Sequence, residues 1–146
     1  MIIRTKYNSK KCEFNGHVFD SKDEMLYYQY LLSIQAKRPK IIIELQPKFE
    51  LIPNYIYRDK KRRGITYTAD FKATVEDGTF VIIDIKGMET QQSVMRRKLF
   101  EYKYPEIKLM WVSRNLKYGT NGWIGYDELK QIRSKNKKEK VHDHHR

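Results

Sequence analysis

Residues 65–86 read ITYTADFKATVEDGTFVIIDIK, and the fold prediction begins from this segment. Two runs rich in β-branched and aromatic residues, 65–75 and 79–86, flank the turn-forming sequence Glu76-Asp77-Gly78. Runs of this kind on either side of a short glycine-containing segment indicate a β-hairpin. The number of residues in the turn then sets which side chains share a face of the hairpin.

A three-residue turn is the register that buries an apolar face. A two-residue turn at Asp77-Gly78 would place Phe71 beside Asp84 and mix apolar with polar residues on both faces. A three-residue turn, with Gly78 in the left-handed conformation, makes one face almost wholly apolar. Its pairs are Phe71 with Ile83, Ala73 with Val81 and Ala69 with Ile85. Burial selects this register, because a slip of one residue would turn the apolar side chains to solvent.

The selected register places two carboxylates together on the other face. Asp70 lies opposite Asp84, and Lys86 points the same way two residues further along. Directly opposed residues have Cβ atoms about 4.5–5.5 Å apart, so the carboxylates repel each other. A divalent cation between them explains the pair, since hard cations bind carboxylate oxygens. The alternative is that both lie on a solvated face and are screened by water.

The rest of the chain predicts a mixed α/β domain with the order α-β-β-β-α-β-α. Ser21 and Glu24 have the spacing of a helical capping box, and Arg38-Pro39 closes that helix. The expected strands are 41–45, 49–57, 65–75, 79–86 and 107–112; the helices are 21–38, 91–104 and 126–133. Residues 58–64 and 119–125 are expected to be loops, and residues 1–20 irregular with a turn at Asn15-Gly16.

We expect one domain over residues 1–135, followed by a flexible basic tail over 136–146 that contains His142, His144 and His145. The formal net charge of the 146 residues is +12, which favours a polyanionic partner, nucleic acid before an anionic membrane surface. No apolar run is long enough to span a bilayer. The single cysteine, Cys12, excludes an internal disulfide and a cysteine-based zinc cluster, as expected of an intracellular protein.

Several of these residues together resemble the PD-(D/E)XK nuclease superfamily. The motif reads Ala69-Asp70, then Asp84-Ile85-Lys86, after a helix that carries Glu24. With Gln46-Pro47, the arrangement is similar to transposon-end endonucleases, small phage endonucleases and Holliday-junction resolvases. The resemblance covers about residues 19–113 and implies a restriction-endonuclease-like core with a mixed central sheet of order α-β-β-β-α-β plus a C-terminal helix. Two departures are Ala69 in place of the motif's proline and Asp84 in place of the more usual glutamate.

The resemblance implies catalytic roles for five residues. Asp70 and Asp84 would hold Mg²⁺ or Mn²⁺, with the backbone carbonyl of Ile85 as a further ligand. Lys86 would orient or help to deprotonate the attacking water and stabilise developing negative charge. Glu24 would bind the metal directly or through water, although its place in a capping box is a sufficient structural reason for it. Gln46 would orient the phosphate or a water, or it is a polar residue at a strand end.

Basic and polar residues near these elements are candidates for phosphate contacts, which carry no sequence information. A solvated basic surface is the alternative. The DNA-binding candidates are Lys60, Lys61, Arg62 and Arg63 in the expected loop, Thr90 and Gln91 at the start of the second helix, and Arg96, Arg97 and Lys103 along it. The candidates for stacking on unpaired bases are Tyr55, Tyr57, Tyr67 and Trp123, with burial in the core or in a strand as the alternative.

The leading hypothesis is a Mg²⁺-dependent DNA endonuclease, phage-associated by resemblance, that acts in the cytoplasm of the host cell. Branched DNA such as a Holliday junction is a plausible substrate, because no module that reads base sequence is visible. A homodimer would allow two strands to be cut. The alternatives are a non-catalytic nucleic-acid-binding module on the same scaffold and a basic interaction protein of a phage or ribosome.

Overall fold

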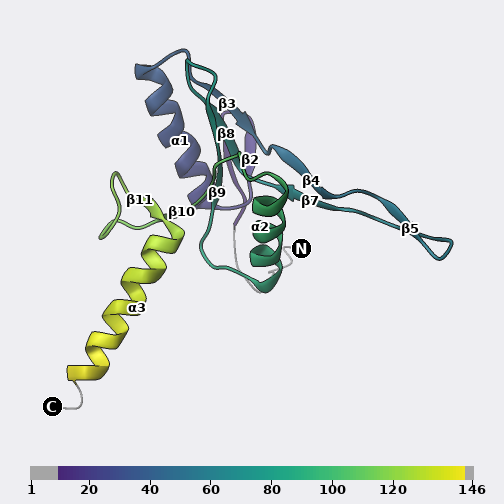
Figure 1. Cartoon of the computed structure of the whole chain (residues 1–146). Helices are drawn as coiled ribbons and strands as arrows, with labels where there is room; N and C mark the ends of the chain where they lie inside the picture. Colours follow the sequence, from purple (N-terminus) through teal and green to yellow (C-terminus); the bar gives the residue numbers. More distant parts are fainter. Residues whose placement is uncertain (1–9, 144–146) are drawn as a thin grey trace.

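The computed structural model describes residues 10–143 and shows a mixed α/β fold built on a five-stranded sheet (Figure 1). The sheet order is β11-β10-β9-β8-β3, and within it only β9 and β10 are parallel. Its strands are β3 (Ile42–Leu45), β8 (Phe71–Thr74), β9 (Phe80–Ile85), β10 (Leu109–Arg114) and β11 (Trp123–Gly125). The helices are α1 (Lys22–Lys37), α2 (Gln91–Lys103) and α3 (Tyr126–Asp143).

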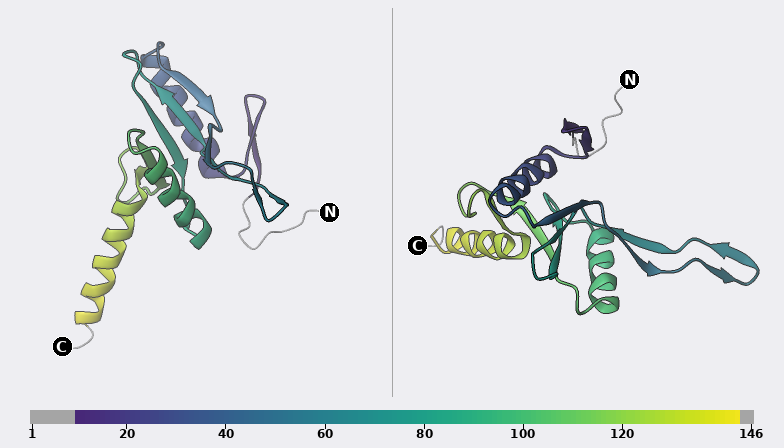
Figure 2. Two further views of the ribbon diagram at one scale, coloured as in Figure 1. Left: turned by 45° about the vertical axis from the view of Figure 1, so that its right-hand side comes forward. Right: turned by 90° about the horizontal axis from the view of Figure 1, so that it is seen from above.

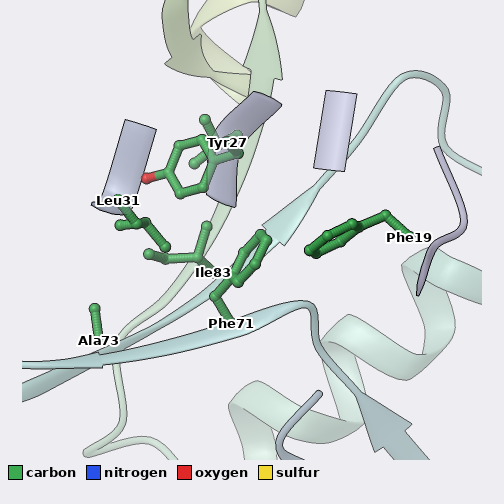
Figure 3. Close-up of a cluster of buried hydrophobic side chains, with 7 residues drawn as sticks. Phe19, Tyr27, Leu31, Phe71, Ala73 and Ile83 are labelled. Carbon is green, nitrogen blue, oxygen red and sulfur yellow. The ribbon is translucent and has the colours of Figure 1, made fainter. Parts of the chain in front are cut away.

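Helix α1 covers one face of the sheet. The Ser21 hydroxyl caps it by accepting a hydrogen bond of 3.1 Å from the Glu24 N–H, as its sequence predicts. Tyr27 and Leu31 of this helix are buried against Phe71 and Ile83 of the sheet (Figure 3). The complete buried cluster is Phe19, Tyr27, Leu31, Phe71, Ala73, Ile83 and Val112.

Helix α2 covers the opposite face. Its residue Phe100 is fully buried against Ile82, the neighbour of Ile83 in β9. Successive residues of a strand point to opposite faces, so Ile82 and Ile83 belong to different clusters. The second cluster is Leu51, Tyr67, Ala69, Ile82 and Phe100. Helix α2 also connects the parallel strands β9 and β10, as a crossover between parallel strands requires.

The predicted hairpin register is confirmed. Phe71 pairs with Ile83 and Ala73 with Val81, and the Val75 N–H donates to the Thr79 carbonyl at 2.9 Å. Gly78 has φ +88°, the left-handed conformation that the three-residue turn needs. The apolar face of this hairpin therefore lies under α1, and burial fixes the register.

The expected strand 65–75 is interrupted at Ala69-Asp70, which separates β7 (Ile65–Thr68) from β8. Ala69 consequently does not face Ile85 as predicted: it packs in the cluster under α2, whereas Phe71 packs under α1. The segment that pairs with it is interrupted at the same place, between β3 and β4 (Lys48–Ile52), where Gln46 has φ +52°. Sequence alternation missed the break because each half of the strand alternates regularly.

Beyond this break the two paired segments of the chain continue as a long two-stranded ribbon. β4 pairs with β7, and β5 (Tyr55–Tyr57) pairs with β6 (Lys60–Arg62). The segment 58–64, expected to be a loop, is thus half of a β-hairpin. Its turn is only Arg58-Asp59, and both residues have positive φ, as a type I′ turn requires. The ribbon projects from the body of the fold (Figures 1 and 2).

Four further elements differ from the sequence expectation. β1 (Cys12–Phe14) and β2 (His17–Phe19) form a hairpin around the predicted Asn15-Gly16 turn, and strand β11 lies in the expected loop 119–125. Helix α3 runs to Asp143, so residues 136–143 of the expected tail are helical. Within this part, the Asn136 amide donates a hydrogen bond to the Tyr118 hydroxyl at 2.9 Å. His144 and His145 lie outside the described residues. Among residues 10–143, no helix has the length and apolar character needed to cross a membrane.

Candidate functional site

Asp70 and Asp84 meet where β8 and β9 begin to separate. The Asp70 N–H donates to the Ile83 carbonyl at 3.1 Å, and its Oδ2 accepts a hydrogen bond of 2.7 Å from the Ile85 N–H. The predicted register does not continue past Phe71, because the Asp70 N–H bonds to Ile83, the residue that pairs with Phe71. Asp70 is therefore not directly opposite Asp84 as predicted, but the two carboxylates are close enough to interact. Burial raises the pKa of Asp70 strongly, and the charges of Asp84 and Glu24 raise it further. The pair is therefore held together at an electrostatic cost.

The acid pair separates two hollows. Asp70 lines a hollow of about 310 Å³ on the α1 side, together with Glu24 and Gln46. Asp84 and Lys86 line a hollow of about 260 Å³ beside the start of α2. The break at Ala69-Asp70 explains the division, because it turns Asp70 away from the regular alternation of β8. A molecule bound in either hollow reaches one member of the pair.

Glu24 brings a third carboxylate from the first turn of α1. Its backbone N–H makes the helix cap, while its side chain lines the hollow shared with Asp70. Burial raises the pKa of Glu24 to about 7, and repulsion by Asp20 and Asp84 contributes. Glu24 can therefore cap the helix through its backbone N–H and take part in the site through its carboxylate.

Gln46 faces Asp70 across the interrupted ribbon. Its backbone N–H donates to the Asp70 carbonyl at 2.9 Å, and the next contact along the ribbon is the Ala69 N–H to the Pro47 carbonyl at 3.1 Å. The side chain lines the hollow that contains Glu24 and Asp70. The structure thus brings Gln46 to the carboxylates, as predicted.

A chain of hydrogen bonds holds Asp84 in place. The Tyr67 hydroxyl donates to Asp84 Oδ2 at 2.6 Å and accepts a hydrogen bond of 2.8 Å from Trp111 Nε1. Burial and the charge of Asp84 raise the pKa of Tyr67, so its hydroxyl remains a donor. Asp84 itself is only 7% exposed. This arrangement leaves one carboxylate oxygen fixed by a neutral donor.

Lys86 approaches the same carboxylate from the other side. Its Nζ lies 3.4 Å from Asp84 Oδ2 and 4.8 Å from the centre of the Trp111 ring. Its backbone is fixed on both sides, because its N–H donates to the Val112 carbonyl and its carbonyl accepts from the Ser113 hydroxyl. The ammonium group is therefore positioned at the mouth of the hollow, where it can contact a bound anion.

The start of α2 forms one wall of this second hollow. Thr90 and Ser93 make a reciprocal capping box, with hydrogen bonds of 3.0 and 2.8 Å. Gln92, Ser93 and Arg96 line the hollow with Lys86. Gln91, which we predicted to contact DNA here, instead lines a separate hollow with Glu89, Val94 and Met95. Successive residues of a helix point about 100° apart, so Gln92 lines the hollow with Lys86 and Gln91 does not.

Two of the cations predicted to bind phosphate, Arg97 and Lys103, make contacts with other parts of the protein. The Arg97 guanidinium lies 4.0 Å over the Trp111 ring, and its Nη1 donates to the Asp127 carboxylate at 3.1 Å. Lys103 Nζ donates to the Glu50 carbonyl at 2.8 Å. Neither lines the hollow that contains Arg96. Arg96, Arg97 and Lys103, all predicted to contact phosphates, therefore do not form a single surface.

The basic segment Lys60–Arg63 lies far out on the ribbon and is exposed. It does not line the hollows of the acid pair. Its connection to the site is through β7, whose residues Thr66 and Thr68 line the hollow with Asp84.

Within residues 10–143 the side chains of histidine, cysteine, aspartate and glutamate form no group of three arranged to hold a metal ion. Asp70 and Asp84 are adjacent, and Glu24 lies near enough for Asp84 to raise its pKa. The structure thus presents two adjacent carboxylates with a third beside them.

Tyr67 and Trp111 were not identified as site residues from the sequence. Tyr67 was interpreted as a strand residue or a stacking candidate, and Trp111 as part of a buried strand. A signal was present, because a buried Tyr hydroxyl or Trp N–H needs a hydrogen-bond partner. Each partner is far away in the sequence, so only the folded chain identifies it.

The family described as "Protein of unknown function (DUF1064)" matches residues 4–120. The matched range includes Glu24, Gln46, Asp70, Asp84 and Lys86, and it ends before α3. No curated protein and no solved structure matches the chain.

Proposed function

Because the chain belongs to the DUF1064 family, whose description assigns no activity, we propose an activity from its own site: metal-dependent hydrolysis of phosphodiester bonds in DNA. The observation that carries the proposal is the meeting of Asp70, Asp84 and Lys86 at the break in the ribbon, with Glu24 beside them. The net charge of +12 favours a polyanionic substrate.

The acid pair fits a divalent cation. Two adjacent carboxylates are buried here with a third nearby, and their repulsion raises the pKa of Asp70 and of Glu24. A hard cation with oxygen ligands would remove that repulsion. Asp70 and Asp84 would hold Mg²⁺ or Mn²⁺, with the Ile85 carbonyl as a further ligand and Glu24 as the third carboxylate. When bound, the cation would neutralise charge on a phosphate and acidify a coordinated water.

The protein's own residues would position the water, the phosphate and the metal-binding carboxylate. Lys86 Nζ would orient the attacking water and stabilise negative charge that develops on the phosphate. Tyr67 would keep Asp84 in one orientation through its 2.6 Å hydrogen bond. Thr90, Gln92 and Arg96 would receive the phosphate group on the other side of the second hollow. Gln46 would orient a ligand in the first hollow.

A restriction-endonuclease-like core is part of the proposal. Its support is the mixed sheet between α1 and α2, with the motif Asp70 and Asp84-Ile85-Lys86 on the β8–β9 hairpin. Branched DNA is the proposed substrate, because contacts to phosphates recognise shape rather than sequence. Two copies of the chain would then cut two strands.

Cleavage of a panel of DNA substrates tests the proposal. Linear duplex, single strand, flap and four-way junction are incubated with Mg²⁺, Mn²⁺ or EDTA. We expect metal-dependent cleavage by the wild type, loss of cleavage in Asp70→Asn and Asp84→Asn, and full activity in Glu101→Gln, a control on exposed α2 surface. DNA binding without cleavage under every condition would contradict the enzyme and favour the non-catalytic binding module.

A further inference from the structure

The outer part of the ribbon is an arm that has no core of its own. We define the arm as residues 54–63, which comprise β5, the Arg58-Asp59 turn and β6. Tyr55, Ile56 and Tyr57 are 49%, 70% and 54% exposed, although apolar and aromatic side chains normally gain stability by burial. The arm and α3 extend from the body in opposite directions (Figures 1 and 2). An exposed apolar strand on a projecting arm points to a binding partner.

The base of the arm is a close-packed joint. The Gly64 N–H donates to the Asn54 side-chain oxygen at 2.8 Å. A Cβ at Gly64 would lie 2.0 Å from the Ile52 carbonyl oxygen and 2.7 Å from the Pro53 carbonyl carbon. The backbone at residues 52–54 can approach residue 64 this closely only because residue 64 is glycine. The arm is therefore held by a defined contact at the point where it leaves β4 and β7.

The charge of the arm indicates the kind of partner. The arm contains five basic residues and one acidic residue, and Lys60, Lys61, Arg62 and Arg63 are all exposed. Tyr55 pairs with Arg62 and Tyr57 with Lys60, so one face alternates aromatic with cationic side chains. Ile56 and Lys61 pair on the opposite face. A second copy of the arm is a poor partner, because like charges would meet.

We propose that the arm binds in a groove of duplex DNA, away from the bond that is cut. The inference rests on the proposed nuclease function and adds a second contact surface to it. The major groove is about 12 Å wide and admits a two-stranded β-ribbon. The cations would contact the phosphates on both sides of the groove, while Tyr55, Ile56 and Tyr57 would lie against base edges.

The ribbon sets the distance between the arm and the acid pair. Lys60 and Asp70 are ten residues apart along one side of the ribbon, which spans at most about 33 Å when extended. Base pairs in B-DNA rise about 3.4 Å each, so the arm reaches at most about ten base pairs from the acid pair. Thr66 and Thr68 of β7 connect the two surfaces. The arm would thus contact the duplex within about one helical turn of the acid pair.

The first test removes the charge of the arm. Lys60, Lys61, Arg62 and Arg63 are replaced together by Gln, and the control replaces the exposed α3 residues Lys135, Lys137, Lys138 and Lys140 by Gln. The two variants have equal net charge. On a 20-base-pair duplex in EDTA, we expect the arm variant to bind at least about tenfold more weakly at low salt, with a slope of log K against log salt less negative by about 2–4. The control is expected to retain most of the wild-type slope.

The second test measures the reach of the arm. In a shortened variant, residues 54–63 are replaced by Asn-Gly, which forms a two-residue hairpin turn. The ratio of wild-type to variant affinity is measured on duplexes of 8, 12, 16 and 20 base pairs, with thermal unfolding as a check of folding. We expect a ratio near one on the shortest duplex that rises with length. If the shortened variant does not fold, Tyr55→Ala and Tyr57→Ala replace it, and the same rise is expected with an unchanged salt slope.

The outcomes separate the arm from the nuclease proposal. Arm-dependent binding without any cleavage would leave the arm supported and refute the enzyme. Cleavage with equal affinities of the arm variant, the α3 control and the wild type would refute the arm alone. A ratio that does not change with duplex length would refute the proposed reach. A change of oligomeric state in the shortened variant, with DNA affinity unchanged, would make the arm a contact between copies and overturn the inference.

Discussion

The Tyr67 hydroxyl donates a 2.6 Å hydrogen bond to Asp84 Oδ2, the same oxygen that lies 3.4 Å from Lys86 Nζ. Asp84 comes from β9 of the five-stranded sheet, whereas Tyr67 comes from β7, which pairs with β4 in a separate two-stranded sheet. The hydrogen bond therefore crosses the opening at the break in the ribbon. It fixes Asp84 Oδ2, as the Ile85 N–H fixes Asp70 Oδ2, so each carboxylate has one oxygen held by a donor.

Replacement of Tyr67 by Phe is expected to loosen Asp84 without removing it. The substitution deprives Asp84 Oδ2 of a donor and Trp111 Nε1 of its acceptor, both buried. We expect the free energy of unfolding to fall by about 1–3 kcal/mol, the cost of unpaired buried polar groups. We also expect cleavage to fall about 10–100-fold, with a higher Mg²⁺ concentration needed for half-maximal activity.

Tyr104→Phe is the matched control, since the Tyr104 hydroxyl donates to the Glu50 carbonyl at 2.8 Å, on the side of α2 that packs against β4. Equal effects of the two substitutions on the Mg²⁺ dependence would contradict a positioning role for Tyr67.

Replacement of Lys86 by Ala is expected to separate DNA binding from cleavage. Lys86 lies beside Asp84 and over Trp111, so in the proposed reaction it would act on the water and on the charge that develops. An interaction made in the transition state lowers the rate when it is lost, and has little effect on ground-state affinity. We expect at least about 100-fold slower cleavage at saturating DNA. Wild-type cleavage by purified Lys86→Ala would refute the role, and Lys108→Ala on exposed surface controls for charge.

Replacement of Asp70 by Asn is expected to stabilise the metal-free protein. Burial and the neighbouring carboxylates raise the pKa of Asp70 in the folded chain. As the pH rises above the ordinary carboxyl range, the unfolded chain loses this proton first, so the wild type loses stability. In EDTA at pH 8 we expect Asp70→Asn to unfold at a temperature several degrees higher, since one unit of pKa shift corresponds to about 1.4 kcal/mol.

The same pair of proteins gives the metal control. The difference in unfolding temperature should shrink as the pH falls to and below the ordinary carboxyl pKa of 3.8, because the wild-type carboxyl then becomes protonated in the unfolded chain as well. Mg²⁺ should raise the unfolding temperature of the wild type and leave that of Asp70→Asn nearly unchanged. A variant that is less stable than the wild type in EDTA at pH 8 would show that repulsion does not govern this site.

Adjacent arginines on α2 are expected to behave differently. Arg96 lines the hollow with Lys86, whereas Arg97 lies between Trp111 and Asp127. Arg96→Gln should weaken DNA binding and make its salt slope less negative by about one, with unfolding unchanged. Arg97→Gln should lower the unfolding temperature and leave the salt slope unchanged. Titrations at several salt concentrations and thermal melts of both variants check this, and a reversal of the two effects would overturn the assignment of the hollow.

Features that depend on local periodicity and turn chemistry are readable from the sequence. The alternation of apolar residues in 71–83 and the glycine at position 78 admit one register that buries an apolar face, and the structure has that register. The Ser21 cap likewise marks the start of α1. Since neighbouring residues carry these signals, they are readable before the chain folds, and they already predict that Asp70 and Asp84 lie close together.

The break in the ribbon and the residues around the acid pair depend on the folded chain. The break at Ala69-Asp70 depends on Gln46 across the ribbon, and each half of the strand alternates normally without showing it. Lys86 was expected beside Asp84, but the donor Tyr67 was not, and Trp111 joins it through the parallel pairing of β9 with β10. The second half of the arm similarly reads as a basic loop, because β5 and β6 pair with each other and bury no apolar face. Contacts between residues distant in sequence are set by packing of the whole chain, which no local pattern records.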